Sequence, residues 1–327
     1  NIHLYFNHRC LDIDWQNGTA TFEDENKEVK SYTGTRILGS DGAFAATRSR
    51  MQIGDRFDYS QSYLEHGYKE LAIPAGENGQ FLIEKNALHI WPRGSYMMIA
   101  LPNPAGDFTC TLFYPYEGEN SFDKLNTKDD FQAFFERDFK DAMEIMPTLA
   151  EEFFNNPTSS LVTVRCFPWI KSDKLALIGD AAHAIVPFYG QGMNCSFEDC
   201  LVLDQCIEKH YPNWENVFSE YQKLRKPNAD AIADLAVQNF IEMRDLVGDA
   251  DFLEKKHIEH DLAELYPKHY KSQYELVSFS TVPYSVAKAQ GQKNDAIINK
   301  IRKEKIDIKN SEIMIPLLKE MESFIEQ

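Results

Sequence analysis

The chain has 327 residues, of which 43% are hydrophobic and 26% charged, and its formal net charge is −17. This length allows two domains with cores of their own, and the composition is that of an ordinary globular protein. Such an acidic surface repels phosphate backbones, so we expect no nucleic-acid partner. No apolar run of roughly 18 residues occurs, which predicts no transmembrane helix and no membrane anchor in this chain.

The six cysteines are scattered, and none of them forms a Cys-x-x-Cys pair. This spacing predicts reduced thiols and a cytoplasmic protein rather than a disulfide framework. Cys195, Cys200 and Cys206 fall in one predicted helix, where we expect them to pack in the core.

The first 40 residues predict strands and turns. The segment "NIHLYFNHRCLDIDW" has strand character from its first residue, and "TATFED" pairs back across a turn at Asn17-Gly18. A short strand in "TRILGSDG" ends at Asp41-Gly42. The chain begins without Met and without a signal-peptide pattern, so we expect the natural protein to start upstream.

Residues 63–115 predict an antiparallel sheet, because apolar segments alternate with Gly- and Pro-containing turns. Its expected strands are "YLEHGYKELAI", "QFLIE", "ALHIW", "SYMMIAL" and "DFTCTLFY". The polar stretch 117–130 predicts a loop. The following segment has a helical period with Phe131, Phe134, Phe135 and Phe139 on one side, which indicates a core-facing helix.

The strand "SLVTVRCFPW" is followed by a strand, a turn and then helices from Gly192 to Phe279, with a break expected near Pro227. Residues 285–327 are polar apart from "IMIPLLKEM". The runs "RKP" and "KIRKEK", and the "HIEHD" segment with its two histidines, are typical of solvated helix surfaces, so no metal site is predicted.

The segment with the clearest chemical signal is "KLALIGDAAHAIVPFYGQGMNCSFEDC", Lys174 to Cys200. A strand of buried character ends at Gly179-Asp180, where ligands of α/β sheets bind. The Asp180 carboxylate is suited to accept hydrogen bonds from sugar or polyol hydroxyls, and Gly179 allows close backbone approach. A plain strand-to-helix turn with a capping Asp is the structural alternative. We expect His183 to be a packed, hydrogen-bonded residue rather than a catalyst.

The second half of this segment, "GQGMN", opens a helix. Gly190, Gln191, Gly192, Met193 and Asn194 place backbone N–H groups at the positive helix end, which stabilises negative charge on a ligand. The neighbouring aromatic residues, Phe188 and Tyr189, are suited to pack against a planar ring.

Together these segments resemble a known family, the class A flavoprotein aromatic hydroxylases. "GDAAHAIVPFYGQGMNCSFEDC" is similar to their flavin-binding motif, and "RILGSDGAFAATRSR" is similar to their second fingerprint. In that family the second fingerprint serves both FAD and NADPH. The resemblance therefore implies cofactor contacts from Asp41, Gly42, Arg48, Gly179, Asp180, Gly190, Gln191, Gly192, Met193 and Asn194.

The resemblance covers nearly the whole chain and implies a mixed α/β fold. We expect a Rossmann-like FAD-binding domain, incomplete at its N-terminus, with an inserted antiparallel-sheet substrate domain and a C-terminal helical region. The expected parts are residues 1–60, 61–168, 169–235 and 236–327. The Gly-x-Gly-x-x-Gly motif that binds the ADP half of FAD does not occur. We therefore expect this chain alone to bind FAD poorly.

Within the family, the flavin loop and "AVQNFIEMRD" are most similar to members that hydroxylate L-kynurenine. The resemblance implies substrate contacts from Pro187, Phe188, Asn239, Glu242, Met243 and Tyr274. Three of them, Asn239, Glu242 and Met243, are spaced i, i+3 and i+4, so they share one face of the predicted helix. A partly exposed helix with Arg244 paired locally is the alternative reading of this segment.

The implied reaction is FAD- and NADPH-dependent hydroxylation of L-kynurenine to 3-hydroxykynurenine with O2, through a C4a-hydroperoxyflavin, in tryptophan degradation. No catalytic acid or base is assigned, because the aniline nitrogen of the substrate already activates its ring. Two alternatives stay open. One is another class A hydroxylase with a phenolic or polycyclic substrate, and the other is a non-catalytic remnant that binds a partner.

Overall fold

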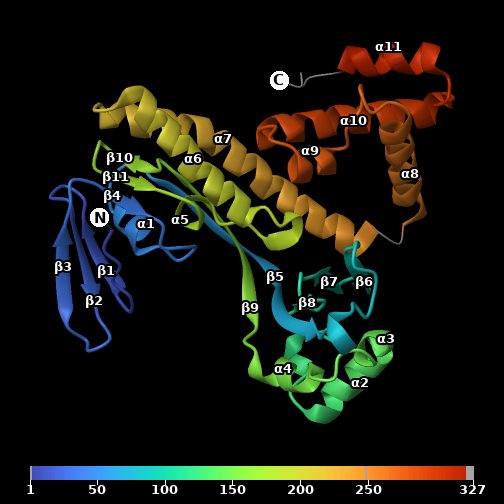
Figure 1. Cartoon of the computed structure of the whole chain (residues 1–327), viewed down its shortest axis with the longest axis horizontal. Helices are drawn as coiled ribbons and strands as arrows, with labels where there is room; N and C mark the ends of the chain where they lie inside the picture. The colour runs from blue at the N-terminus through green and yellow to red at the C-terminus, as the bar shows by residue number, and fades with distance from the viewer. Residues whose placement is uncertain (1, 247–248, 322–327) are drawn as a thin grey trace. The chain divides into compact units, whose positions relative to one another are not determined.

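The computed structural model describes residues 2–246 and 249–321 (Figure 1). Its internal contacts divide the chain into two compact units. Unit 1 comprises Asn1–Ser62, Val162–Val237 and His257–Gln327, and unit 2 comprises Tyr63–Leu161 and Gln238–Lys256. The mixed α/β fold expected from the sequence is confirmed. The division into four parts stays a prediction.

Unit 1 begins with an antiparallel three-stranded sheet of β1 (Arg9–Asp14), β2 (Thr19–Glu23) and β3 (Val29–Thr33). The prediction of a strand from the first residue was wrong for residues 2–8, and Asn1 lies outside the described residues. The physical reason is the lack of a partner strand, because the β1–β2 ladder starts where Arg9 faces Glu23, the last residue of β2.

A second sheet in unit 1 positions the two sequence motifs. Its strand order is β10 (Ile170–Lys171), β11 (Leu175–Leu177), β4 (Ile37–Gly39), and β11 runs parallel to β4. Short helices follow each parallel strand: α1 (Ala46–Met51) after β4, and α5 (Asp180–His183) and η3 (Pro187–Tyr189) after β11. The buried strand β11 is confirmed.

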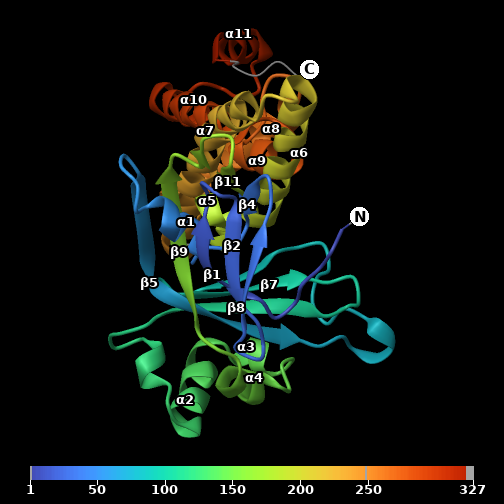
Figure 2. The same cartoon turned by 90° about the vertical axis from the view of Figure 1, so that its left-hand side faces the viewer.

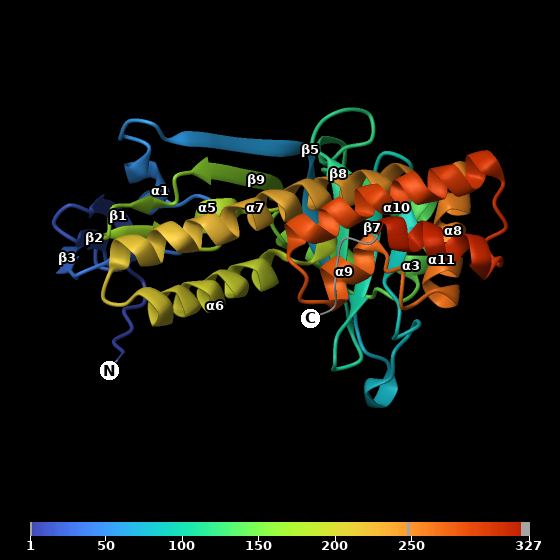
Figure 3. The same cartoon turned by 90° about the horizontal axis from the view of Figure 1, so that it is seen from above.

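Two long helices, α6 (Gly192–His210) and α7 (Trp214–Ile241), lie side by side (Figures 1 and 3). All of α6 and the part of α7 up to Val237 belong to unit 1. The expected break near Pro227 was wrong, because α7 continues through it and the chain turns between His210 and Trp214 instead. Contacts on both sides of the proline hold the helix: Tyr221 donates to the Leu177 carbonyl at 3.0 Å, and Asp234 pairs with Arg165 at 2.5 Å. These tertiary contacts outweigh the loss of one helical hydrogen bond.

The α6 cysteines do not all pack inward. Cys195 and Cys206 are buried on the same face as Leu203, but Cys200 is exposed, so its predicted core position was wrong. Cys200 lies five residues after Cys195, which places it away from a face defined by three- and four-residue steps. All six thiols are free.

The C-terminal part of the chain consists of helices α8 (Ala250–Leu265), α9 (Gln273–Phe279), α10 (Tyr284–Glu304) and α11 (Ser311–Met321). The stretch from residue 285 is more than polar surface, because α10 and α11 bury Ile297, Ile301, Met314 and Leu318 in a common core cluster with Leu262 of α8. Amphipathic helices with widely spaced apolar residues produce such a core only when packed together.

Unit 2 contains most of a five-stranded sheet with the order β6-β7-β8-β5-β9. Its strands are β5 (Asp58–Ile73), β6 (His89–Pro92), β7 (Met97–Pro102), β8 (Phe108–Pro115) and β9 (Ser159–Phe167). The strand predicted at "QFLIE" was wrong, because a 3₁₀ turn η1 (Glu77–Gly79) and a loop occupy this region. Its Phe81 and Ile83 pack on the core of unit 2, so core packing explains their apolar alternation.

Helices cover one face of this sheet (Figure 2). They are η2 (Phe122–Lys124), α2 (Lys128–Asp138), α3 (Lys140–Met143) and α4 (Leu149–Asn155). The prediction that the phenylalanine stripe faces the core is confirmed, since all four rings are buried. Thr127 caps α2 by accepting from the Asp130 amide at 3.1 Å, which sets the start of the helix.

We predict that Phe135→Ala lowers the free energy of unfolding by about 3–5 kcal/mol, because it opens a cavity in the core of unit 2. Phe135 is fully buried, and its ring centroid lies within 6 Å of those of four other phenylalanine rings. Urea unfolding followed by fluorescence measures the loss. Phe197→Ala removes an exposed ring and serves as the control, and equal losses for both variants would contradict the core assignment.

Candidate active site

The two Gly-Asp segments predicted to bind a cofactor meet at one sheet edge. Leu177 of β11 pairs with Gly39 of β4, and the Ile178 amide donates to the Gly39 carbonyl at 2.9 Å. Because the strands are parallel, their carboxyl ends emerge together. Asp41 and Gly42 therefore follow one strand and Gly179 and Asp180 follow its neighbour. Asp41 also accepts from the Thr47 amide at 3.0 Å and so orients the first turn of α1.

Arg48 links the segments that follow these two strands. Its side chain is buried, with 2% exposure, and its guanidinium donates to the Ala181 carbonyl at 2.8 Å and to the Ala43 carbonyl at 2.5 Å. A buried guanidinium bound to two carbonyl groups holds the α1 and α5 segments together. A direct cofactor contact by Arg48 stays a prediction.

The Gly179-Asp180 turn presents a carboxylate to solvent. Gly179 has φ = 61°, a left-handed conformation that favours glycine, and a Cβ there would lie 3.0 Å from the Ser196 hydroxyl oxygen. Asp180 is exposed, and partial burial by the surrounding chain raises the pKa of its carboxyl, although nearby His183 acts in the opposite direction. An accessible carboxylate at a strand end is suited to bind the hydroxyls of a polyol chain.

The start of α6 fits the edge of a planar anionic ring. The first helical amides have no carbonyl partner within the helix, and the side chain of the N-cap residue Gln191 makes no capping hydrogen bond to them. Gly190 has φ = 65°, with open space where a Cβ would lie. Gly192 also carries no side chain, and Met193 and Asn194 are exposed. These features leave a positive helix end open to a ligand.

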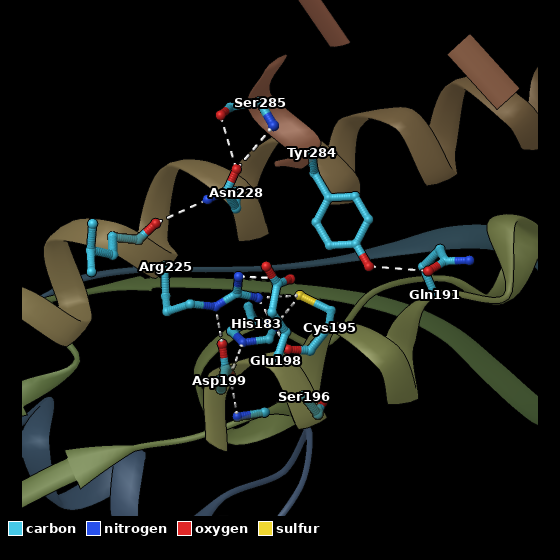
Figure 4. A network of polar contacts seen from close by, with 12 residues as sticks. His183, Gln191, Cys195, Ser196, Glu198, Asp199, Arg225, Asn228, Tyr284 and Ser285 are labelled. Atoms are coloured by element: carbon cyan, nitrogen blue, oxygen red, sulfur yellow. Dashed lines mark hydrogen bonds and ion pairs between the residues drawn. The ribbon is translucent and has the colours of Figure 1, made fainter. Parts of the chain in front are cut away.

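Two tyrosines from the C-terminal helices hold this loop. Tyr284 donates to Gln191 Oε1 at 3.1 Å (Figure 4). Asn194 Nδ2 donates to the same oxygen at 3.1 Å. Tyr274 stacks on Tyr189 with ring centroids 5.8 Å apart and an interplanar angle of 28°. The resemblance drawn from the sequence implied a role for Tyr274 but none for Tyr284, which ends the same stretch, "YELVSFSTVPY".

Pro187 and Phe188, both predicted to contact substrate, differ in exposure: Phe188 is buried, while Pro187 is exposed. Both lie in η3, directly before the glycine-rich start of α6. Phe188 therefore shapes the loop from within, and Pro187 is the member of the pair that solvent or a ligand reaches.

A buried polar cluster lies behind the loop (Figure 4). Asp199 is fully buried and accepts from the Gly179 amide at 2.9 Å, from His183 Nε2 at 2.5 Å and from Arg225 Nε at 2.7 Å. Arg225 also donates to the Cys195 carbonyl at 3.1 Å and pairs with Glu198 at 2.7 Å. The prediction that His183 is a packed, hydrogen-bonded residue is confirmed.

Arg225 corrects a prediction. Its "RKP" run was expected to be solvated, yet Arg225 is 1% exposed because Asp199 and Glu198 compensate its charge. Sequence analysis also missed Asp199. A signal was present, because Cys195, Asp199, Leu203 and Cys206 share helical spacing, and an acid on an otherwise apolar face requires a partner.

The segment predicted to bind substrate lies in unit 2 and is only partly α-helical. The α-helix ends at Ile241, and a π-helical turn η4 (Glu242–Leu246) follows. Asn239 Nδ2 still reaches Met243 Sδ at 3.5 Å, so these two residues share a face as predicted. Single π-helical turns within α-helices occur frequently at functional sites.

Glu242 has partners within the chain. It accepts from Gln238 at 3.0 Å and lies 3.8 Å from the Lys256 ammonium, while Arg244 pairs with Asp245. The local pairing of Arg244 considered from the sequence is therefore present. The substrate contacts of Glu242, Asn239 and Met243 stay predictions.

In the described ranges, 2–246 and 249–321, no three or more His, Cys, Asp or Glu side chains are grouped to hold a metal ion. Within the same ranges, every helix is too short or too polar to cross a membrane.

Comparisons with known proteins identify the family. Residues 4–236 match the family described as FAD binding domain. The chain is 51% identical to "Kynurenine 3-monooxygenase" of Dictyostelium discoideum, over 94% of this chain and 70% of that protein. It is 46% identical to the protein of that name in Myxococcus xanthus, over 98% of this chain and 71% of that protein. The chain belongs to the kynurenine 3-monooxygenase family. The resemblance stated from the sequence is thereby confirmed.

Solved structures support the fold assigned to this kynurenine 3-monooxygenase family member. The oxygenase of 2-methyl-3-hydroxypyridine-5-carboxylic acid superposes with a TM-score of 0.58 at 20% identity, over 76% of this chain and 64% of that chain. Tetracycline destructase Tet(51) superposes with a TM-score of 0.53 at 17% identity, over 84% of this chain and 70% of that chain.

We predict that the stability of unit 1 falls as pH rises from about 7 to about 9. Burial lowers the pKa of His183, but the bond to Asp199 outweighs it and raises this pKa to about 10. The unfolded chain releases this proton near pH 6.5. The native state thus holds an extra proton between these values, and unfolding free energy falls by at most about 1.4 kcal/mol per pH unit.

Urea unfolding at several pH values measures this slope. His183→Gln keeps a donor for Asp199 but does not titrate, so subtracting its profile isolates the contribution of His183 from those of other groups. The native pKa of Asp199 lies below its usual range, because His183 and Arg225 outweigh the effect of burial. Its carboxylate therefore stays charged throughout. Equal slopes for wild type and variant would contradict the assignment.

Proposed function

We propose that the protein is an FAD- and NADPH-dependent monooxygenase that hydroxylates L-kynurenine to 3-hydroxykynurenine with O2. The observation that carries this proposal is the identity of 46–51% to proteins named kynurenine 3-monooxygenase in three organisms, over more than nine-tenths of the chain. The FAD-binding family match and the open loop after β11 support the same activity. The proposal also predicts that the protein has no nucleic-acid partner and that it is cytoplasmic.

In this proposal the residues around the β4–β11 sheet edge hold FAD. Asp180 accepts from hydroxyls of the ribityl chain, and the amides of Gly192, Met193 and Asn194 bind the pyrimidine edge of the ring. Bound FAD, once reduced by NADPH, supplies the oxygen-transfer chemistry. The task of the protein is to place the ring and to keep water away from it.

The loop is built for fixed placement. Tyr284 and Asn194 both bind Gln191 Oε1, and Tyr274 stacks on Tyr189, so the loop is held at several points. A loop held in this way loses little conformational freedom when a ligand binds, which favours affinity. In unit 2, Asn239 would donate to substrate, with Met243 supplying apolar contact.

We predict that L-kynurenine stimulates NADPH consumption by the full-length natural protein supplied with FAD, and that the product has gained one oxygen atom by mass. Absorbance measures NADPH, and mass spectrometry identifies the product. Flavin bound without any response to L-kynurenine would leave another aromatic hydroxylase as the function. No bound flavin at all would favour the non-catalytic remnant and contradict the proposal.

We further predict that Asn239→Ala weakens L-kynurenine binding by about tenfold or more while FAD stays bound. A hydrogen bond to a charged ligand group contributes about 1.5–3 kcal/mol, which sets this magnitude. Substrate titration of the flavin absorbance measures the affinity. Ile241→Ala, an exposed position on the same helix, is the control, and unchanged affinity in Asn239→Ala would rule out the substrate contact.

A further inference from the structure

Asp199 is connected to both segments that carry the proposed flavin contacts. One of its oxygens, Oδ2, accepts from the Gly179 amide at 2.9 Å and from His183 Nε2 at 2.5 Å. These residues flank Asp180 in the α5 turn. The other oxygen accepts from Arg225, which donates in turn to the carbonyl of Cys195 in the first turn of α6. A single carboxylate thus bridges the α5 turn and the start of α6 (Figure 4).

The cluster is rigid for an electrostatic reason. His183, Asp199 and Arg225 are each no more than 4% exposed, and Glu198 compensates the second positive charge. Buried charges persist only while every partner is in place, because loss of one partner leaves an uncompensated charge in a medium of low polarity. Movement of either segment away from Asp199 would break several charge-assisted hydrogen bonds at once.

We propose that Asp199 is a positioning residue for the flavin. Acting with His183 and Arg225, it keeps the Asp180 carboxylate and the amides at the start of α6 at a constant separation. The inference rests on the proposed function, since those two groups are the proposed contacts for the ribityl chain and the pyrimidine edge. Asp199 itself is fully buried behind the loop, so the role assigned to it involves no direct contact with flavin or substrate.

The test uses Asp199→Asn in the full-length natural protein. Asn keeps one oxygen acceptor, and its NH₂ group faces either Arg225 Nε or the two groups that donate to Oδ2, so at least one bond is lost. We expect amide exchange in residues 179–183 and 192–196 to become about tenfold faster, measured by mass spectrometry without cofactor. We also expect FAD affinity, measured by fluorescence quenching, to fall about tenfold.

A third readout separates positioning from general destabilisation. If the start of α6 moves away from the pyrimidine edge, reduced flavin loses stabilisation and the reduction potential falls. About 30 mV corresponds to each tenfold change for a two-electron couple. Tyr221→Phe removes a buried hydrogen bond to the Leu177 carbonyl and leaves the hydrogen bonds of Asp199 in place, so it is the control for the loss of a buried hydrogen bond. It should leave both the potential and the local exchange unchanged.

The outcomes distinguish this inference from the proposed function. Failure of the full-length natural protein to bind FAD would count against the proposed function, and the exchange measurement would still test the bridge. Wild-type FAD binding with unchanged exchange, affinity and potential in Asp199→Asn would overturn the inference alone. If Asp199→Asn does not fold, His183→Ala removes one donor to the same oxygen, and an exchange pattern identical to wild type would likewise overturn the inference.

Discussion

The buried carboxylate of Asp199 accepts hydrogen bonds from a backbone amide, a histidine and an arginine, and the geometry of the site depends on it. It lies 20 residues from Gly179 and 26 from Arg225 in the sequence. It therefore joins the end of a strand, a turn and two long helices at one point. A buried charge with this many partners specifies one arrangement of its neighbours, because alternatives leave charged groups unpaired.

The parallel pairing of β4 with β11 provides the second constraint. It places Asp41 and Asp180 at the same sheet edge, although 138 residues separate Leu38 from Ala176, its partner in the ladder. Arg48 reinforces this edge by binding the Ala181 carbonyl from α1. Arg48 thus connects the segments that follow β4 and β11. Asp199 connects the turn after β11 to the start of α6.

Unit 2 is stabilised mainly by apolar packing rather than by buried charges. A cluster of phenylalanine rings on short helices covers one face of an antiparallel sheet, and this apolar core requires few buried polar groups. The segment with Asn239 and Met243 belongs to the same unit and departs from α-helical geometry at Glu242. Such a turn redirects side chains within one helix, which suits a residue set proposed to contact a small polar substrate.

The sequence by itself determined the local chemistry of this protein. The glycines and Asp180 around β11, the helix start at Gly192 and the phenylalanine stripe were all predictable, because each depends on nearest neighbours or on helical period. Only the tertiary structure decided that Arg225 is buried, that α7 continues through Pro227 and that Tyr284 binds Gln191. These outcomes depend on partners distant in the chain, whose charges and hydrogen bonds outweigh local preference.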